Sequence, residues 1–445
     1  MRYGFPRAAA MACIAFLLVS ALVAVRSGPV PPMDDTYIHL VYGRSILRGQ
    51  PLQFNPGTPS SGFTSPLWLA AAAAAAPAGT EWAPAVLMAL SAVAGCAAVL
   101  LSGAGPAPLF LLLLGPLLFH GSSGMETALA CLAVVLVWRR LESGGEPDLR
   151  GGLLLAGAIL VRPELALLAV PLALGAGRPK GRQLAALLWP PLAAGGLWMA
   201  WNLYATGLPL PSTFYAKQAG AAAYGLLPGL RGLARNLALG APLLVPAGGW
   251  AAFRLLRRRD PLGLVPALTL IPALLLQPNA FFQLRYHVPW LAAFALAAGR
   301  MLAGRRWPAA LVALSLVPGM LLFASRRVRA ADDVEAIDVR PAQLLRREAP
   351  RGSTVAAADV GAMGWVSGLR VLDLDGLVTP RALREGRDWD WVAARADYLA
   401  AFPRQYSDLV ESAADRLVPM ARFESPSPVI CGEESVAVWR VEGSD

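Results

Sequence analysis

The stretch PPMDDTYIHLVYGRSILRGQPLQFNPGTPSSGFTSPLW (residues 31–68) follows directly after the first hydrophobic segment of the chain. It places two adjacent carboxylates, Asp34 and Asp35, within a few residues of a predicted membrane surface. The residues TYIHLVYGRSIL have apolar side chains at the spacing of three to four that is typical of a helix, so we expect the acids to cap an interfacial helix. A polar loop of turn residues and aromatics follows, and it contains Asn55.

This carboxylate pair allows two interpretations. The plainer one is a solvated turn after a helix, as at Asp332 and Asp333 further along the chain. The functional one is a carboxylate at the outer mouth of a helical bundle, which can act as a general base on an acceptor hydroxyl or hold a cation. The helical pattern and the loop behind Asp34 and Asp35 favour the functional interpretation.

The composition predicts a membrane protein. Of the 445 residues, 56% are hydrophobic and 15% are charged, with a mean hydropathy of +0.51. A soluble globular protein has about 25% charged residues. The apolar residues form runs, several of them of membrane-spanning length, so we expect an α-helical polytopic membrane protein with about 10–11 hydrophobic segments. These segments lie at 8–25, 66–77, 83–102, 106–119, 126–138, 151–175, 183–203, 236–253, 262–277, 287–303 and 306–324.

The net charge of +10 does not indicate a nucleic-acid partner. The basic residues gather in short clusters between apolar runs, such as RLLRRRD (254–260), and this pattern is typical of cytoplasmic loops. With Arg2 and Arg7 inside, residues 31–65 are expected to lie outside. With RLLRRRD (254–260) and AGRR (303–306) also inside, the loops 204–235 and 278–286 and the region after 325 are expected to be external. The first segment is expected to be an uncleaved helix rather than a signal peptide.

The segment 151–175 is unusual for a membrane span. It has basic clusters on both sides, and its middle reads VRPEL (161–165), with Arg162, Pro163 and Glu164 where a simple span is apolar. Two half-helices that turn at these residues would explain both features, because charged or broken helices at membrane depth must face protein or a watery cavity.

The composition changes after about residue 330. Charge density becomes ordinary, and strand-like runs such as STVAAAD, RVLDLDG and SVAVWRVE alternate with helical ones. We therefore expect a transmembrane domain at 1–328 with an external loop at 27–65, and a small soluble extracytoplasmic α/β domain at 329–445. Within it, DVGAMGWVSGLRVLDLDGLVTP (359–380) ends on Asp373 and Asp375 and is read as a structural turn or as a lid. The four cysteines show neither metal-site spacing nor an obvious disulfide pair.

Three further stretches carry candidate site residues. HGSSGMETAL (120–129) contains His120 and Glu126, which at a helix start are usually caps or satisfied pairs. The loop WNLYATGLPLPSTFYAKQ (201–218) and the stretch QPNAFFQLRYHVPW (277–290) combine aromatics with basic residues, which suit a sugar and a phosphate respectively, although aromatics there can also be simple interface anchors. The candidates in these two stretches are Tyr215 and Lys217, and Arg285, Tyr286 and His287.

Six motifs occur in one order along the chain, namely the stretch from DDTYIHL to SPLW, then GMETAL, LVRPE, LPLPSTFYAK, RYHVPW and DVGAMGWVSGLRVLDLDGLVTP. In this they resemble the membrane glycosyltransferases of GT-C type, and most closely the group of the mycobacterial terminal β-(1→2)-arabinofuranosyltransferase and its bacterial relatives. The similarity covers about residues 30–290 and 355–380. One departure is PLPSTFYAK where relatives more often have LPNTFYAK, so the sugar and acceptor are not carried over.

The resemblance implies a GT-C-like enzyme of the bacterial plasma membrane that moves a sugar from a polyprenyl-phosphate donor to an envelope glycan, lipid or protein on the external face. It places the catalytic base on Asp34 or Asp35, with Asp34 favoured, and a single displacement would invert the anomeric centre. A divalent cation is compatible with the pair, and no metal ligands are assigned. The donor site would draw on Arg285, Lys217, Arg162, Tyr215, Tyr286, His287, Glu126 and Asn55.

Two other functions stay open. The same charges in a polytopic transporter or flippase would bind a lipid-linked saccharide without reacting with it. The external loop after the first span and the soluble C-terminal region suit an enzyme better, and the lack of internal repeats disfavours a transporter. A third alternative is a polytopic scaffold in which the C-terminal domain binds a partner.

Overall fold

The structure is a computed structural model that describes residues 7–103, 105–175, 177, 179–216, 226–276, 281–382, 388–426 and 428–442. The predicted site residue Lys217 lies outside these ranges. Contacts between residues divide the chain into two compact units. Unit 1 comprises residues 1–25, 88–198 and 221–326, and unit 2 comprises residues 26–87, 199–220 and 327–445.

Several helices are long and apolar enough to cross a membrane. Four among the described residues meet this condition: α1 (Arg7–Ser27), the continuous run Pro66–Leu101 with α3 (Pro66–Ala75) and α4 (Gly79–Leu101), α10 (Gly181–Thr206), and the run Arg306–Glu348 that begins with α17 (Arg306–Val334). A fifth forms if α12 (Leu226–Gly240) and α13 (Leu244–Arg257), which are bent by 96°, make one broken span. The prediction of a multi-pass helical membrane protein is confirmed.

The predicted segments outnumber these helices for a structural reason. Segments 66–77 and 83–102 belong to a single helical run of 36 residues. Others fold as shorter helices: α5 (Ala107–Leu113), α6 (Gly115–Gly121), α7 (Thr127–Glu142), α14 (Leu264–Leu276) and α16 (Val288–Met301). Apolar composition therefore identified helices without fixing which are long enough to span.

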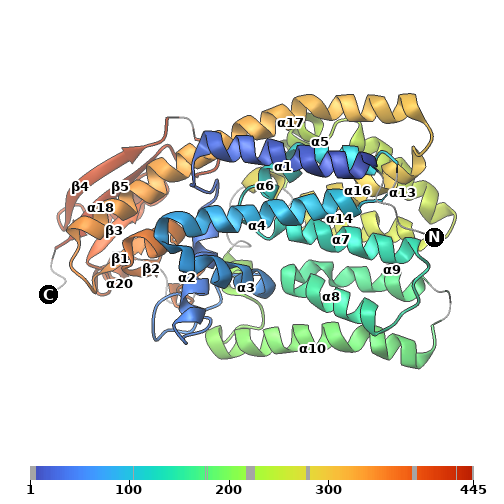
Figure 1. Cartoon of the computed structure of the whole chain (residues 1–445). Coiled ribbons are helices and arrows are strands. Elements are labelled where there is room, and N and C mark those ends of the chain that lie inside the picture. The colour runs from blue at the N-terminus through green and yellow to red at the C-terminus, as the bar shows by residue number, and fades with distance from the viewer. Residues whose placement is uncertain are drawn as a thin grey trace. The chain divides into compact units, whose positions relative to one another are not determined.

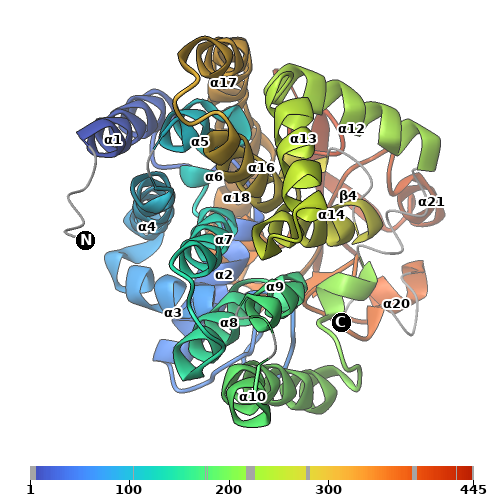
Figure 2. The same cartoon turned by 90° about the vertical axis from the view of Figure 1, so that its right-hand side faces the viewer.

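The expected break at Arg162 is confirmed. Helix α8 (Leu149–Val161) ends where Arg162 adopts an extended backbone (φ −152°, ψ 118°), as the residue before a proline favours. A 3-10 turn (Pro163–Leu168) and α9 (Ala169–Leu174) follow. Figures 1 and 2 both draw α8 and α9 side by side, so the chain folds back after Arg162.

The core of unit 1 forms around α16. This helix is apolar almost all round, and the residues from Val288 to Gly299 are buried. Figure 2 looks along the helices of this unit and shows α13 and α14 against α16, and α5 and α7 also contact it. Cys13 of α1 and Cys96 of α4 form a disulfide across 83 residues, which their spacing did not suggest.

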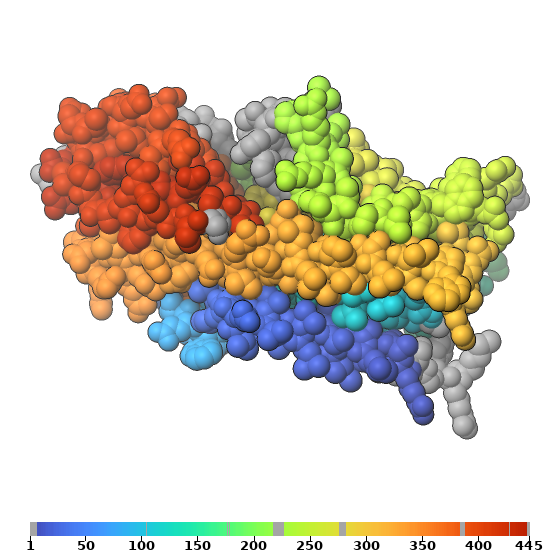
Figure 3. All heavy atoms as spheres, turned by 90° about the horizontal axis from the view of Figure 1, so that it is seen from above, coloured from blue at the N-terminus to red at the C-terminus, as the bar shows by residue number. Residues whose placement is uncertain are grey.

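Unit 2 contains a mixed five-stranded sheet in the order β2-β1-β3-β5-β4. The strands are β1 (Thr354–Ala357), β2 (Arg370–Asp373), β3 (Tyr398–Ala401), β4 (Leu417–Glu424) and β5 (Ser435–Val441). The strands β2, β1 and β3 are parallel, whereas β5 is antiparallel to both β3 and β4. With α18 (Arg340–Glu348), α20 (Trp389–Ala393) and α21 (Ser407–Ser412) they form the predicted α/β domain, whose later residues are drawn red and whose α18 is drawn orange in Figure 3.

Residues 27–65, which the sequence predicts to form an external loop, belong to the same unit as this sheet. Helix α2 (Asp35–Leu47) packs on α3 and on the helical turn Met363–Ser367. The Arg44 guanidinium donates to the carbonyls of Gly364 and Trp365 and lies 4.6 Å above the Trp365 ring. Residues 27–65, predicted as part of a domain at 1–328, thus contact residues of the C-terminal segment 327–445 directly.

Candidate functional site

The Asp34 carboxylate is held by two backbone amides of the C-terminal segment. The N–H of Gly361 donates to Oδ2 and the N–H of Ala362 donates to Oδ1, both at 2.6 Å. These amides are free to donate because they open a helical segment, where backbone N–H groups have no intrahelical acceptor. The carboxylate therefore has a fixed orientation, and each oxygen keeps lone-pair capacity for a further proton.

The expectation that Asp34 caps α2 is wrong. Asp34 is the residue before the first turn of that helix, but among the described residues its side chain makes no capping hydrogen bond there. Its oxygens accept from Gly361 and Ala362 instead. The predicted helix itself is confirmed as α2.

The environment of Asp34 changes its acidity. Burial raises the pKa of Asp34 to about 6, against the opposing effect of the Ala362 and Gly361 amides, and the neighbouring charge of Asp35 raises it further. A carboxyl group with this pKa is mostly ionised at neutral pH yet binds a proton far better than an ordinary aspartate. These are the properties of a general base.

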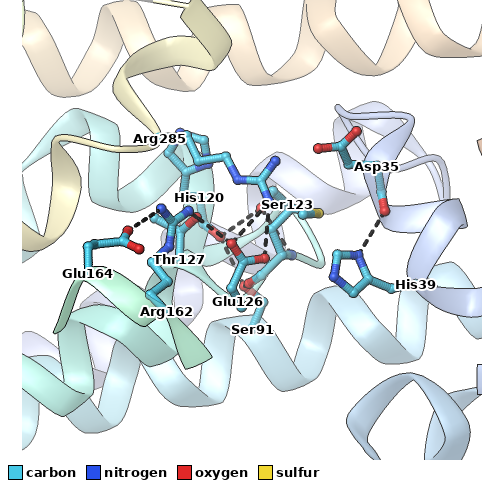
Figure 4. Close-up of polar contacts among 11 residues, drawn as sticks. Asp35, His39, Ser91, His120, Ser123, Glu126, Thr127, Arg162, Glu164 and Arg285 are labelled. Atoms are coloured by element: carbon cyan, nitrogen blue, oxygen red, sulfur yellow. Dashed lines mark hydrogen bonds and ion pairs between the residues drawn. The ribbon is translucent and has the colours of Figure 1, made fainter. Parts of the chain in front are cut away.

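Asp35 opens α2 and differs from its neighbour. Its backbone carbonyl lies 2.9 Å from Nδ1 of the buried His39, one helical turn later. Figure 4 shows the Asp35 carboxylate pointing away from the His39 ring. The histidine thus contacts the backbone of the first turn of the helix that carries Asp35.

In unit 1, Glu126 joins two arginines in a buried cluster. Its Oε1 lies 2.9 Å from Nη2 of Arg162 and 3.0 Å from Nη2 of Arg285, and the carboxylate is fully buried (Figure 4). Glu164 forms a second ion pair with Arg162 at 3.1 Å and is partly exposed. The sequence interpretation of Glu126 as a satisfied pair is confirmed.

Aromatic and polar groups complete this cluster. The Tyr286 ring lies under both guanidinium groups, 4.9 Å from Cζ of Arg162 and 5.8 Å from Cζ of Arg285. His120 is buried and its Nε2 lies 3.1 Å from the carbonyl of Gln283. A small pocket opens beside the cluster, lined by Glu164, Leu165, Thr269, Pro272, Ala273, Tyr286 and Pro289.

One donor of the cluster has no partner among the residues that the structure describes. Arg162 Nε is buried and makes no hydrogen bond there. An unsatisfied buried donor costs on the order of 1–3 kcal/mol, more for a charged group. A phosphate oxygen is the kind of acceptor that would satisfy it.

The structure gives the other predicted residues different positions. The side-chain amide of Asn55 donates to the carbonyl of Val371 (2.8 Å) and accepts from its N–H (2.9 Å), so it ties the loop after α2 to β2. His287 is buried at the start of α16. Tyr215 is half-buried in unit 2 with its ring against Phe214. The predicted residues therefore fall into two groups in two units and not into one continuous set.

The glycine-rich stretch ends in a structural turn. The Asp373 carboxylate accepts from the N–H groups of Asp375, Gly376 and Val378, and Asp375 accepts from the Tyr406 hydroxyl at 2.8 Å. This arrangement agrees with the plainer interpretation of residues 359–380 at this end. Sequence reasoning missed Gly361 and Ala362 as partners of Asp34, because no local pattern marks a contact across 327 residues.

Three comparisons with known proteins bear on this geometry. Residues 327–439 match a family model described as a domain of unknown function (DUF8728). No curated protein matches the chain. Among solved structures, ArnT from Cupriavidus metallidurans in the apo state is similar with a TM-score of 0.59 and 13% identity, over 96% of this chain and 97% of ArnT.

The ArnT structure bound to undecaprenyl phosphate is similar as well. Its TM-score is 0.61 at 13% identity, over 97% of this chain and 98% of that one. The chain therefore has the GT-C fold over nearly its whole length, as the resemblance implies. The narrower similarity to the mycobacterial arabinofuranosyltransferase group stays a prediction.

Proposed function

We propose that this protein is a membrane glycosyltransferase that moves a sugar from a polyprenyl-phosphate donor to a hydroxyl group of a cell-envelope glycan, lipid or protein. The observation that carries the proposal is the half-buried Asp34 carboxylate, held by the Gly361 and Ala362 amides, on a GT-C fold. ArnT, which shares that fold, has been solved with undecaprenyl phosphate bound.

In the proposed reaction Asp34 is the general base. It removes the proton of the acceptor hydroxyl as the oxygen attacks the anomeric carbon, and the bond from that carbon to the donor phosphate oxygen breaks. The two backbone N–H groups hold the carboxylate in one orientation, so little reorganisation accompanies the proton transfer. A single displacement of this kind inverts the anomeric centre.

The leaving phosphate is proposed to bind Arg162 and Arg285. Both guanidinium groups are almost fully buried. A contact between a guanidinium and a phosphate is stronger in such a site than in water, because water does not screen it there. Glu126 fixes them, and the Nε of Arg162 supplies a donor that is not used within the described structure. Because Glu126 and Glu164 balance two arginine charges, we expect the cluster to bind phosphate through directed N–H groups rather than through a large excess of positive charge.

The proposed location is the plasma membrane of a bacterium, with Asp34 and the C-terminal domain on the external face. A divalent cation beside Asp34 and Asp35 stays a prediction, as does the identity of the sugar, a hexose or a pentose. Roles of Lys217, Tyr215, Tyr286, His287 and Asn55 at the donor also stay predictions, and for Asn55 the contact with Val371 favours a structural role.

The test is donor cleavage by the protein in lipid nanodiscs, with a panel of polyprenyl-phosphate sugars carrying labelled pentoses and hexoses. We expect release of polyprenyl phosphate with transfer of the label to extracted envelope material, and loss of both in Asp34→Asn. Asp408→Asn, which removes an exposed carboxylate of α21, is the control. Translocation of the intact donor without cleavage would support the transporter instead.

Because the side chain of an asparagine cannot accept a hydrogen bond at both of its terminal atoms, Asp34→Asn also weakens the contact with Gly361 and Ala362. Its thermal unfolding must therefore be measured beside its activity. If a folded Asp34→Asn variant keeps full transfer activity and Asp35→Asn has none, the base is Asp35. Full activity in both would refute a carboxylate base in this pair.

A further inference from the structure

A second group of acidic side chains in unit 2 takes no part in the proposed reaction. One ligand atom each from Asp338, Asp359 and Cys431 lies within 4.8 Å of the others. They come from three separate segments: Asp338 from the helical turn Glu335–Val339, Asp359 from the end of β1, and Cys431 from the loop before β5. We propose that these three residues bind a zinc ion that ties the segments together.

The first argument is the state of Asp338. Its side chain is 4% exposed, and its Oδ2 atom makes no hydrogen bond within the described residues. A buried carboxylate oxygen without a donor carries a desolvation cost that native structures rarely leave uncompensated. A cation bound at the cluster would compensate it.

The second argument is the sign of the surrounding charge. The charged groups that act most strongly on Asp359 are Asp34, Asp375 and Asp35, and Asp333 adds to those that act on Cys431. All four are acidic. A divalent cation would offset this accumulation of negative charge, which adds to the mutual repulsion of the ligands themselves.

The donor set indicates which cation. A thiolate ligand selects zinc and other thiophilic metals over magnesium and calcium, which take oxygen ligands. Three protein ligands and one water give the tetrahedral site that zinc accepts. Ligand atoms of such a site lie about 3.5 Å apart. The atoms here lie within 4.8 Å of one another, so each separation would shorten by no more than about 1.3 Å on binding.

The fold also fixes the approach to Cys431. Asp333 accepts hydrogen bonds from the Ser425 hydroxyl and from the N–H groups of Val429 and Ile430, and these contacts fix the loop just before Cys431. Asp359 lies two residues before Gly361, whose N–H holds Asp34. The zinc would therefore stabilise the segment that orients Asp34, but the metal site itself does not depend on the proposed glycosyltransferase activity.

The experiment uses the full chain purified in detergent without chelator. We expect about one zinc per chain by elemental analysis, and removal by a chelator should lower the midpoint of thermal unfolding until zinc is restored. Co²⁺ in place of zinc should give a thiolate-to-metal charge-transfer band in the near ultraviolet. Substoichiometric zinc, with no stabilisation on adding it and no such band, would overturn the proposal.

Variants assign the ligands. Cys431→Ser should abolish the cobalt band. Asp338→Asn should weaken zinc binding by at least about tenfold, because mutating a residue that only supports the metal ligands already lowers metal affinity by about that much. Cys131→Ser, at the other free cysteine, and Asp408→Asn should leave both unchanged. A band that persists in Cys431→Ser would show that the thiol is not a ligand and would refute the site. Because these readouts need no sugar donor, they separate failure of the zinc site from failure of the proposed enzyme.

Discussion

The Oδ2 atom of Asp34 accepts a 2.6 Å hydrogen bond from the N–H of Gly361, a residue 327 positions later in the chain. The contact joins the acidic motif after the first helix to the C-terminal α/β domain, and both belong to unit 2. Because the Asp34 carboxylate is oriented by so distant a segment, the C-terminal domain is a part of the proposed active site. The following predictions test this arrangement and the arginine cluster of unit 1.

Gly361→Ala should disrupt the Asp34 contact. A Cβ atom at this position would lie 2.7 Å from Oδ2 of Asp34 and closer still to its carbonyl oxygen, so backbone must move. We expect a loss of about 1–3 kcal/mol in the free energy of unfolding, as for other overpacked sites, together with loss of sugar transfer.

The matched control is Gly157→Ala. Gly157 lies in α8, and a Cβ there meets nothing within 4 Å. This change should leave thermal unfolding unchanged or raise its midpoint slightly, because alanine favours a helix. Equal unfolding midpoints in the two variants would contradict the tight contact at Gly361.

Sugar transfer should depend on pH through Asp34. Since burial raises its pKa to about 6, the base is protonated and inactive well below that pH. With the acceptor at saturating concentration, we expect kcat/KM for the polyprenyl-phosphate donor to increase with pH through about 6 and then to level off. A flat profile between pH 5 and 8 would exclude Asp34 as the titrating base.

The stability contribution of Asp34 should have the opposite sign. A carboxyl group whose pKa is higher in the folded than in the unfolded protein favours folding at low pH. This contribution is fully present below the unfolded value of 3.8 and is lost as the pH rises through about 6. The difference in unfolding free energy between wild type and Asp34→Asn, measured across this window, should change accordingly.

Glu126→Gln should destabilise unit 1 strongly. It removes the charge that both Arg162 and Arg285 contact, and leaving buried charges uncompensated typically costs about 3–5 kcal/mol. Glu164→Gln breaks the ion pair between Arg162 and Glu164, in which the Glu164 side chain is 20% exposed. The loss of unfolding free energy should therefore be far smaller than for Glu126→Gln. Chemical or thermal unfolding in detergent compares the two, and similar losses would show that Glu126 does not organise the cluster.

Asn55→Asp should weaken the connection between the loop after α2 and β2. The asparagine amide both donates to and accepts from the backbone of Val371, whereas an aspartate would face the Val371 carbonyl with an acceptor. We expect a loss of about 1–3 kcal/mol in unfolding free energy. If Asn55→Asp instead raised the donor KM without changing stability, Asn55 would be a donor-binding residue as the sequence first indicated.

Much of the local structure was predictable from the sequence. Hydrophobic runs identified the helices, the Arg162-Pro163 pair identified the break after α8, and the runs around Thr354, Arg370 and Ser435 identified three strands. These features depend on periodicity, on proline and on β-propensity, which act within a few residues. The fold class could be predicted for the same reason.

Which helices are long enough to span could not be read in this way. The alanine-rich run after Pro66 looks too short by itself, and only its continuation into α4 makes a helix of spanning length. Composition records how apolar a segment is, but its helical continuity depends on the surrounding packing.

The sequence by itself determined that the chain is a helical membrane protein with an acidic pair after its first span and a mixed C-terminal domain. Only the tertiary structure decided what those groups contact: Asp34 with Gly361 and Ala362, and Glu126 with Arg162 and Arg285. The physical reason is that burial and charge pairing arise between segments far apart in the chain. The sequence determines the chemistry of a side chain, but the pKa and the partners of a buried group are set by the segments that surround it in the folded protein.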